Sequence, residues 1–398
     1  MEEPPVDVLV LGAGIAGCAL AYHLRRREAG SVLVYDPRTP AAGASGRAAG
    51  VVTEQLWDRW DVEVTRESHR EYAELCRRWE PDAYQQHGFV RWTRDARCGE
   101  ALEAARDRFR SWGVVVDEAA PSRLEGWFPA GRFDDVRFAL HSPHDAAVRP
   151  SSLTTIYAEG ARSAGAVFDF GVPPVALSGD GDGWHLATAL RSVRARHLVI
   201  AAGAWSKAIL QELGHPLPLA PYRTQAALLR PPKPPSPFPT AHDLDTDVYL
   251  RLEDGGRILG GDGTERVECD PERFEPSGDP SFLAHLAESL QSRFPGWAES
   301  EVLSAWAGVC TSTPDRHPIV GRVQGVPGLF VLAGFNGFGV MRAGGVARRL
   351  ADLIVDDGDR EEARTLLGPA DASRFTGTPA AFAPTPGFTL EPGENPRW

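Results

Sequence analysis

Residues 6–17 read VDVLVLGAGIAG, and this stretch decides the fold. The first six residues are mostly apolar and rich in valine, which favours a buried β-strand. The glycines of GAGIAG then allow a tight turn, and residues 19–27 continue in a helical pattern. The segment therefore predicts a strand, a glycine turn and a helix in direct succession.

This turn is suited to the pyrophosphate of a dinucleotide. Gly12, Gly14 and Gly17 permit the tight turn, the close approach of backbone to phosphate and the packing of helix on strand. A second apolar strand, residues 31–35, leads to Asp36, whose carboxylate can accept hydrogen bonds from both ribose hydroxyls. The alternative is a glycine turn without a ligand, which would not need a second strand that ends in an acid. We therefore predict a Rossmann-type dinucleotide site, and the acid disfavours NADP in it.

The following loop distinguishes FAD from NAD. Residues 42–50 read AGASGRAAG. Such small residues let the backbone approach a cofactor that extends beyond its pyrophosphate, which favours FAD. The alternative is a flexible surface loop.

Composition places the chain among ordinary globular proteins. It has 398 residues, more than one core usually holds, and 42% of them are hydrophobic. We find no run of roughly 18 apolar residues and no basic signal at the N-terminus, so we expect a cytoplasmic protein without a membrane span. The formal net charge of -12 argues against nucleic acid as a partner. The five cysteines lack metal-ligand spacing, so we expect free thiols and no metal.

Three later motifs complete a pattern. Residues 198–206 read LVIAAGAWS, residues 306–321 run from WAG to TPDRHPIVG, and residues 330–341 read FVLAGFNGFGVM. With the two N-terminal motifs, and in this order, they resemble the D-amino-acid oxidase superfamily of FAD-dependent oxidoreductases, in its sarcosine oxidase and glycine oxidase-like branch. The resemblance covers residues 6–355.

The resemblance implies an α/β protein of two domains. A Rossmann-type, glutathione-reductase-like FAD-binding domain is expected from residues 1–85, 145–215 and 306–360, and a mixed-sheet α+β substrate domain from residues 86–144 and 216–305. Residues 361–398 would form a C-terminal tail, extended from residue 377 onward. In the substrate domain, residues 247–252 and 257–261 alternate as a hairpin around the turn at residues 254–256.

The resemblance also implies a set of FAD contacts at the ends of the strands and in the glycine-rich loops. They are Gly12, Gly14, Ile15, Ala16, Gly17, Asp36, Pro37, Arg38, Ala44, Ser45, Gly46, Arg47, Val175, Ala202, Gly203, Trp205, Gly308, Gly334, Asn336, Gly337, Gly339, Val340 and Met341. By analogy, a helix at residues 343–354 would point its positive end at the flavin ring and stabilise the reduced anion. The alternative is a glycine-rich turn with a purely steric role.

The resemblance bears on how FAD is held. Some relatives attach FAD covalently through a cysteine before Thr-Pro-Asp, and others through a histidine in the loop after the second strand. Gly308 and Arg47 stand at these two places, and Cys310 lies two positions off. We therefore expect non-covalent FAD.

The substrate side offers several candidates. An amino-acid substrate would need a cation for its carboxylate, preferably an arginine, and the candidates are Arg47, Arg223, Arg251 and Arg342. Arg342 is favoured because it follows Met341, which matches the carboxylate-binding lysine of sarcosine oxidase-like relatives. It can equally point to solvent or to another part of FAD. Tyr249 either hydrogen-bonds the substrate or fills the core.

The expected reaction is oxidation of the C–N bond of a small amino acid or secondary amine, with hydride transfer to flavin N5 and release of an imine. It needs little acid–base chemistry, so we do not expect His317 to act as a base. Oxidases of the sarcosine type use a lysine near the flavin to react with oxygen, and Ile258 stands in its place. The electron acceptor is therefore either oxygen or another compound.

Two other functions stay open. One is the flavin subunit of a multi-subunit amine or proline-type dehydrogenase, and the other is a biosynthetic FAD oxidoreductase for a specialised metabolite. The expected partners are the small-molecule substrate, the electron acceptor and either a second copy of the chain or an electron-transfer subunit. Folate-linked demethylation is not expected, because folate-using relatives carry a further C-terminal region.

Overall fold

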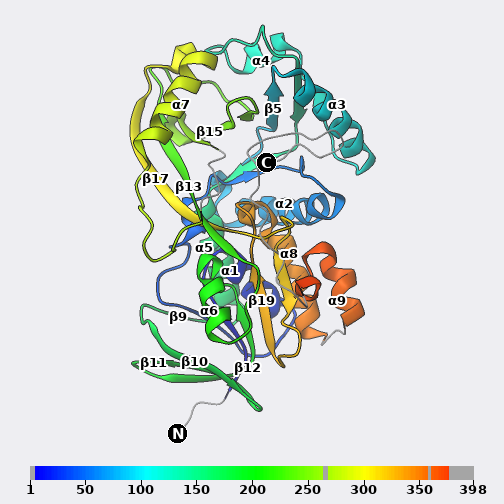
Figure 1. Ribbon diagram of the computed structural model, residues 1–398, viewed down its shortest axis with the longest axis vertical. Helices are drawn as coiled ribbons and strands as arrows, with labels where there is room; N and C mark the ends of the chain where they lie inside the picture. Colours follow the sequence, from blue (N-terminus) through cyan, green and yellow to red (C-terminus); the bar gives the residue numbers. More distant parts are fainter. Residues whose placement is uncertain (1–4, 263–267, 357–359, 376–398) are drawn as a thin grey trace.

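The computed structural model describes residues 5–262, 268–356 and 360–375. Two eight-stranded sheets lie one above the other along the long axis of the molecule (Figure 1). A third, small sheet contains β3 (Val51–Val52), β8 (Ala146–Val148) and β4 (Tyr84–Gln85). The predicted fold class, a Rossmann-type domain with a second mixed-sheet domain, is confirmed.

The first sheet is built around a parallel core, in the order β10-β11-β12-β1-β2-β9, with β19 beside the second half of β12 and β18 beside β19. Its parallel strands are β1 (Val6–Leu11), β2 (Val32–Asp36), β9 (Val167–Phe170), β12 (Ser192–Ile200) and β19 (Leu329–Ala333). Its antiparallel strands are β10 (Pro174–Asp180), β11 (Gly183–Thr188) and β18 (Ile319–Arg322).

Alternation along β1 explains why its sequence is apolar on both faces. Val8 and Val10 lie in one hydrophobic core, whereas Leu9 and Leu11 lie in another. A strand buried on both faces needs apolar side chains throughout. The helices beside the first sheet that contribute to the first core include α1 (Ile15–Arg26), α2 (Arg59–Trp79), α5 (Pro150–Ser163) and α8 (Gly339–Val355), and α6 (Ser206–Glu212) contributes to the second.

The second sheet is mixed, in the order β17-β13-β16-β15-β14-β5-β7-β6. Its strands are β5 (Phe89–Thr93), β6 (Asp117–Glu118), β7 (Phe138–Ser142), β13 (Ala220–Arg230), β14 (Thr240–Asp243), β15 (Val248–Glu253), β16 (Arg257–Asp262) and β17 (Glu301–Ser312). Helices α4 (Pro121–Trp127) and α7 (Pro280–Arg293) pack on its outer face, and α3 (Ala96–Ser111) packs on the opposite face near β7. The rest of that opposite face is turned toward the first sheet (Figure 1).

The C-terminal part differs from the expected tail. Helix α9 (Arg360–Leu367) and two short 3-10 helices, which end at Phe375, pack against the first domain. Leu367 and Ala370 are fully buried, and Val320 of β18 forms a bridge with Asp371. The prediction of a tail is therefore wrong for residues 361–375, because this segment buries apolar side chains. The predicted extended residues 377–398 lie outside the described residues.

The division into two domains stays our proposal. Strands of the first sheet come from residues 1–85, 145–215 and 306–360, and seven strands of the second sheet come from the intervening segments. Strand β17 crosses the proposed boundary. Over the described ranges, the helices include none with the length and apolar composition of a membrane span.

Candidate active site

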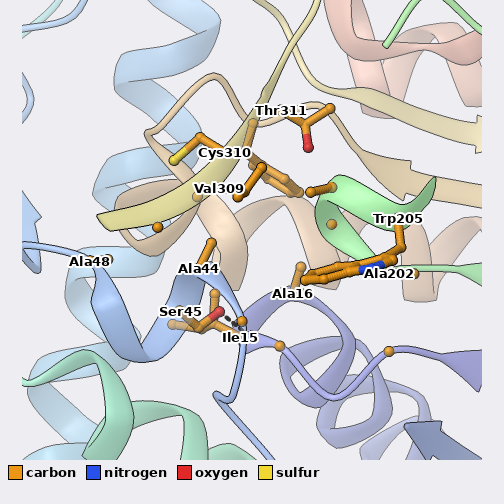
Figure 2. A pocket seen from close by; sticks show the side chains of 18 of the residues that line it. Ile15, Ala16, Ala44, Ser45, Ala48, Ala202, Trp205, Val309, Cys310 and Thr311 are labelled. Carbon is orange, nitrogen blue, oxygen red and sulfur yellow. Dashed lines mark hydrogen bonds between the residues drawn. The ribbon is translucent and has the colours of Figure 1, made fainter. Parts of the chain in front are cut away.

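A cavity of about 980 Å³ runs between the two sheets. This volume lies at the upper end of the range usual for ligand pockets. Its walls come from the loops after β1, β2, β12 and β19, from residues 42–51, and from strands β13, β15 and β17. Figure 2 shows the strand segment 309–311 on one side and Ser45 on the other.

The glycines of the first turn have different tasks. Gly12 has a φ of 117°, and a Cβ there would lie 2.4 Å from the carbonyl oxygen of Ala201. A Cβ at Gly17 would lie 2.0 Å from the carbonyl oxygen of Gly12. Gly17 does not line the cavity, so it serves the packing of α1 on the turn, whereas Gly12 and Gly14 face the cavity.

The N-terminus of α1 opens toward the cavity. The amide of Ile15 donates a hydrogen bond of 2.9 Å to the Ser45 hydroxyl (Figure 2). Asp36, at the end of β2, accepts hydrogen bonds of 2.8 Å from the amides of Ala13 and Arg38. Its carboxylate is therefore held in a fixed orientation on the cavity wall.

An aromatic ring marks the same end of the cavity. The guanidinium carbon of Arg38 lies 4.1 Å from the ring centroid of Trp205, a cation–π contact. The indole N–H of Trp205 donates to Glu272. These three side chains line the cavity beside Asp36.

The loop at residues 42–50 reaches the edge of the second sheet. Arg47 lines the cavity, and its guanidinium donates to the carbonyl oxygens of Ala42 and Gly43. A Cβ at Gly308 would lie 3.2 Å from the Cβ of Arg47, so the two positions are in contact. A Cβ at Gly46 would lie 2.4 Å from the carbonyl oxygen of Ala41, which explains this glycine by packing.

The loop at residues 334–339 brings backbone amides to the cavity. Gly337 and Asn336 have φ values of 84° and 56°. The Asn336 side chain holds the turn, since it donates to the carbonyl of Gly334 at 2.7 Å and accepts from the amide of Thr313 at 2.9 Å. Helix α8 begins at Gly339, which lines the cavity, and no side chain caps its N-terminus. Its first N–H groups therefore carry partial positive charge at the cavity wall.

The chain matches the family model of FAD dependent oxidoreductases, designated DAO, over residues 7–353. It belongs to this family. FAD is the cofactor of the family, so the predicted cofactor is confirmed, and so is the oxidoreductase class.

Comparison with known proteins places this flavoprotein near the predicted branch. Human mitochondrial dimethylglycine dehydrogenase is 27% identical over 394 residues, and the match covers 89% of this chain and 44% of the relative. Human mitochondrial sarcosine dehydrogenase is 25% identical, with coverages of 88% and 39%. The chain thus spans less than half the length of these relatives.

A solved structure supports the fold. Glycine oxidase from Geobacillus kaustophilus superimposes with a TM-score of 0.82 at 22% identity, covering 94% of this chain and 100% of that chain. The resemblance to the sarcosine oxidase and glycine oxidase-like branch is confirmed by these matches.

The cavity fits FAD. All the residues predicted to contact FAD line it, except Gly17 and Gly46. Glycines bare the backbone at the turn after β1 and at the start of α8, and Asp36 is oriented at the end of β2 as a ribose requires. Individual contacts and the non-covalent linkage stay predictions.

Arg342 does not reach the cavity. Its side chain is fully buried, forms an ion pair with Asp61 of α2 and donates to the carbonyl of Phe335 at 2.7 Å. Met341 lines the cavity, but the next residue on a helix points in a different direction. The structure therefore contradicts the predicted clamp at Arg342.

Two other predicted arginines also lie elsewhere. Arg251 is buried, pairs with Glu253 and donates to the carbonyl of Val148 at 3.1 Å. Arg223 pairs with Asp279 at 2.6 Å. Neither lines the cavity, so both assignments to the substrate are withdrawn. Arg47 stays a candidate.

The roof of the cavity carries other polar side chains. Tyr249 of β15 lines the cavity, and its cross-strand partner His242 of β14 lies on the same face. The adjacent pair, Ala241 and Leu250, points into the outer core. Asp247, in the β14–β15 turn, accepts a hydrogen bond of 2.8 Å at Oδ1 from the Nε2–H of His242.

No motif in the sequence indicated His242 or Asp247 as part of the cavity wall. The alternation of β15 could indicate the face of Tyr249 but not which strand lies beside it. The two lysines of the chain, Lys207 and Lys233, do not line the cavity. Ile258 lies in the outer core of the second sheet, so it faces away from the cavity.

His317 and Asp58 lie behind the cavity with the Arg342–Asp61 pair. His317 is 3.0 Å from Asp58 and 3.5 Å from Asp61. Burial raises the pKa of Asp61 to about 6, and the charge of Arg342 opposes this rise. Possible metal-ligand atoms of Asp58, Asp61 and His317 lie within 4.8 Å of one another. The guanidinium of Arg342 already neutralises Asp61, so we assign no metal there.

Asp145 is a second buried acid, beside the cavity wall. It accepts hydrogen bonds from the hydroxyl of Thr53, which lines the cavity, and from the amide of Glu54 at 3.1 Å. Burial raises the pKa of Asp145 to about 7, and these hydrogen bonds oppose the rise. Asp145 therefore changes its charge near neutral pH.

Proposed function

We propose that this flavoprotein oxidises the C–N bond of a small amine or amino acid to an imine. Two relatives at 27% and 25% identity are named for dimethylglycine and sarcosine, which both carry a methylated amino nitrogen. Bound FAD supplies the acceptor for a hydride from the carbon beside that nitrogen, whose lone pair closes the C=N bond.

The observation that carries the proposal is the continuity of the cavity. One wall contains Asp36 and the glycine turn of a dinucleotide site, and the same cavity extends to Tyr249 on the second sheet. A substrate can therefore lie between the roof and the N-terminus of α8. Tyr249 is suited to orient it by a hydrogen bond, and the two sheets exclude water from the reacting atoms.

We further propose that the electrons pass to an acceptor other than oxygen. Neither Lys207 nor Lys233 lines the cavity, and a lysine is what the resemblance to sarcosine-type oxidases requires for oxygen. Cytoplasmic localisation also stays a proposal, since the two named relatives are mitochondrial.

An anaerobic absorbance titration tests both proposals. Purified yellow protein is mixed with a panel of amino acids and N-methylated amines, and air is then admitted. Bleaching by an amine establishes the reaction, and bleaching that persists in air supports the second proposal. Rapid return of the oxidised spectrum would make the protein an oxidase. No bleaching by any member of the panel would refute the proposed function.

A further inference from the structure

His242 and Asp247 form a polar pair on the roof of the cavity. The Nε2 atom of His242 lies 2.8 Å from Oδ1 of Asp247, and both residues line the cavity. The His242 side chain is 6% exposed and that of Asp247 is 26% exposed. The carboxylate is therefore accessible from the cavity while one of its oxygens is held.

The turn that carries Asp247 is fixed in place. Asp247 has a φ of 57°, in the left-handed region, and the carbonyl of the preceding Thr246 accepts a hydrogen bond of 2.8 Å from His285 of α7. A non-glycine residue keeps such a conformation only where its surroundings determine it. The fold therefore holds this carboxylate in place before any ligand binds.

The charges around the cavity differ from those that a carboxylate substrate needs. Arg223, Arg251 and Arg342 are each held by an acid away from the cavity. Within the described ranges, Arg38 and Arg47 are the arginines that line it. Arg38 lies at the Trp205 end, and Arg47 donates to backbone carbonyls of its own loop. Over the described residues, His242 is the basic side chain that pairs with Asp247 on the roof.

We propose that Asp247 binds a cationic group at the non-reacting end of the substrate. This inference rests on the proposed function and names its substrate class: an N-alkylated diamine or longer polyamine, whose second nitrogen carries positive charge. A charge-assisted hydrogen bond from an ammonium to a partly buried carboxylate is stronger than a neutral one. The formal net charge of -12 also attracts cations to the protein.

Three probes with one reacting group test this proposal. N-methylputrescine, N-methylbutylamine and γ-(methylamino)butyrate share an N-methyl amine on a four-carbon chain and end in an ammonium, a methyl group and a carboxylate. Anaerobic flavin reduction gives a rate and a half-saturating concentration for each. We expect N-methylputrescine to have the lowest half-saturating concentration of the three.

The variant Asp247→Asn removes the charge and keeps the backbone, because asparagine tolerates a positive φ. We expect it to raise the half-saturating concentration for N-methylputrescine about ten- to a hundredfold, with little change for N-methylbutylamine and in the limiting rate. Asp254→Asn is the matched control, since Asp254 lies at the other end of β15 and does not line the cavity.

The outcomes separate this inference from the function on which it rests. A lower half-saturating concentration for the carboxylate probe would overturn the inference and leave amine oxidation intact. So would an unchanged preference in Asp247→Asn that is folded and loaded with flavin. Loss of reduction with every probe and with every amine of the wider panel would instead overturn the proposed function. Equal loss of rate with all three probes would show that Asp247 acts at the reacting nitrogen, against the proposal.

Discussion

Arg342 of α8 and Asp61 of α2 form an ion pair in which both side chains are fully buried. The same guanidinium donates to the carbonyl of Phe335, in the loop that leads into α8. The pair therefore joins the packing of two helices to the conformation of a loop on the cavity wall. The role of this buried pair is therefore structural, and the substrate has no access to it.

Loss of one partner of this pair should destabilise the protein. Arg342→Ala leaves Asp61 buried without its counter-charge, which typically costs about 3–5 kcal/mol. We expect this loss in the free energy of unfolding, measured with urea, together with reduced flavin content. Asp61→Asn should cause a smaller loss because the amide keeps one acceptor oxygen for Arg342. A stable, flavin-loaded Arg342→Ala with only a raised KM for an acidic substrate would restore the role first predicted for this residue.

Two glycines of the first turn should give different defects when changed to alanine. Gly17→Ala forces a methyl group onto the backbone oxygen of Gly12, so we expect the apoprotein itself to unfold at lower urea concentration. The Cβ of Gly14→Ala would lie 3.3 Å from the Ser45 hydroxyl and would face the cavity. This variant should keep its folded apoprotein and bind FAD more weakly, as fluorescence titration with FAD would measure. Equal effects of both substitutions on the apoprotein would contradict the assignment.

The stability of the protein should depend on the ionisation of Asp145. Burial raises its pKa from 3.8 to about 7 in the folded state. Between these two values the folded protein holds a proton that the unfolded chain has lost, so this residue makes stability fall as pH rises through the window. Asp145→Asn cannot ionise and should lose this dependence. We expect the Tm of Asp145→Asn, relative to the Tm of the unchanged protein, to rise from pH 4 to pH 7.

The comparison isolates Asp145 because every other titrating group is common to the two proteins. Parallel Tm curves over this range would show that Asp145 does not titrate there. If the Tm of Asp145→Asn instead fell relative to that of the unchanged protein as pH rises, folding would lower the pKa of Asp145, contrary to this prediction.

Flavin should leave the protein on acid precipitation. Gly308 and Arg47, which stand where relatives attach FAD, provide neither a thiol nor an imidazole. We expect yellow colour in the supernatant and a colourless pellet. Flavin that stays in the pellet would refute non-covalent binding, and its release by Cys310→Ser would identify Cys310, on the cavity wall, as the point of attachment.

Much of the FAD side could be read from the sequence because its physics is local. A glycine turn between a strand and a helix, and an acid at the end of the next strand, are defined by neighbours along the chain. Hydrophobic patterning likewise indicated the hairpin of β15 and β16. Val175 was assigned to the FAD site by the family resemblance and not by a local motif. It lines the cavity although it is 71% exposed.

The substrate side was decided by tertiary structure. The sequence alone determined a Rossmann-type FAD protein with a second mixed-sheet domain, because those features follow from short motifs and strand periodicity. Which arginines face the cavity depended on acids far away in the chain: Asp61 is 281 residues from Arg342. His242 and Tyr249 meet only because β14 and β15 pair in one register. A side chain's direction and its ion-pair partner are set by packing across the fold, and only the folded chain fixes them.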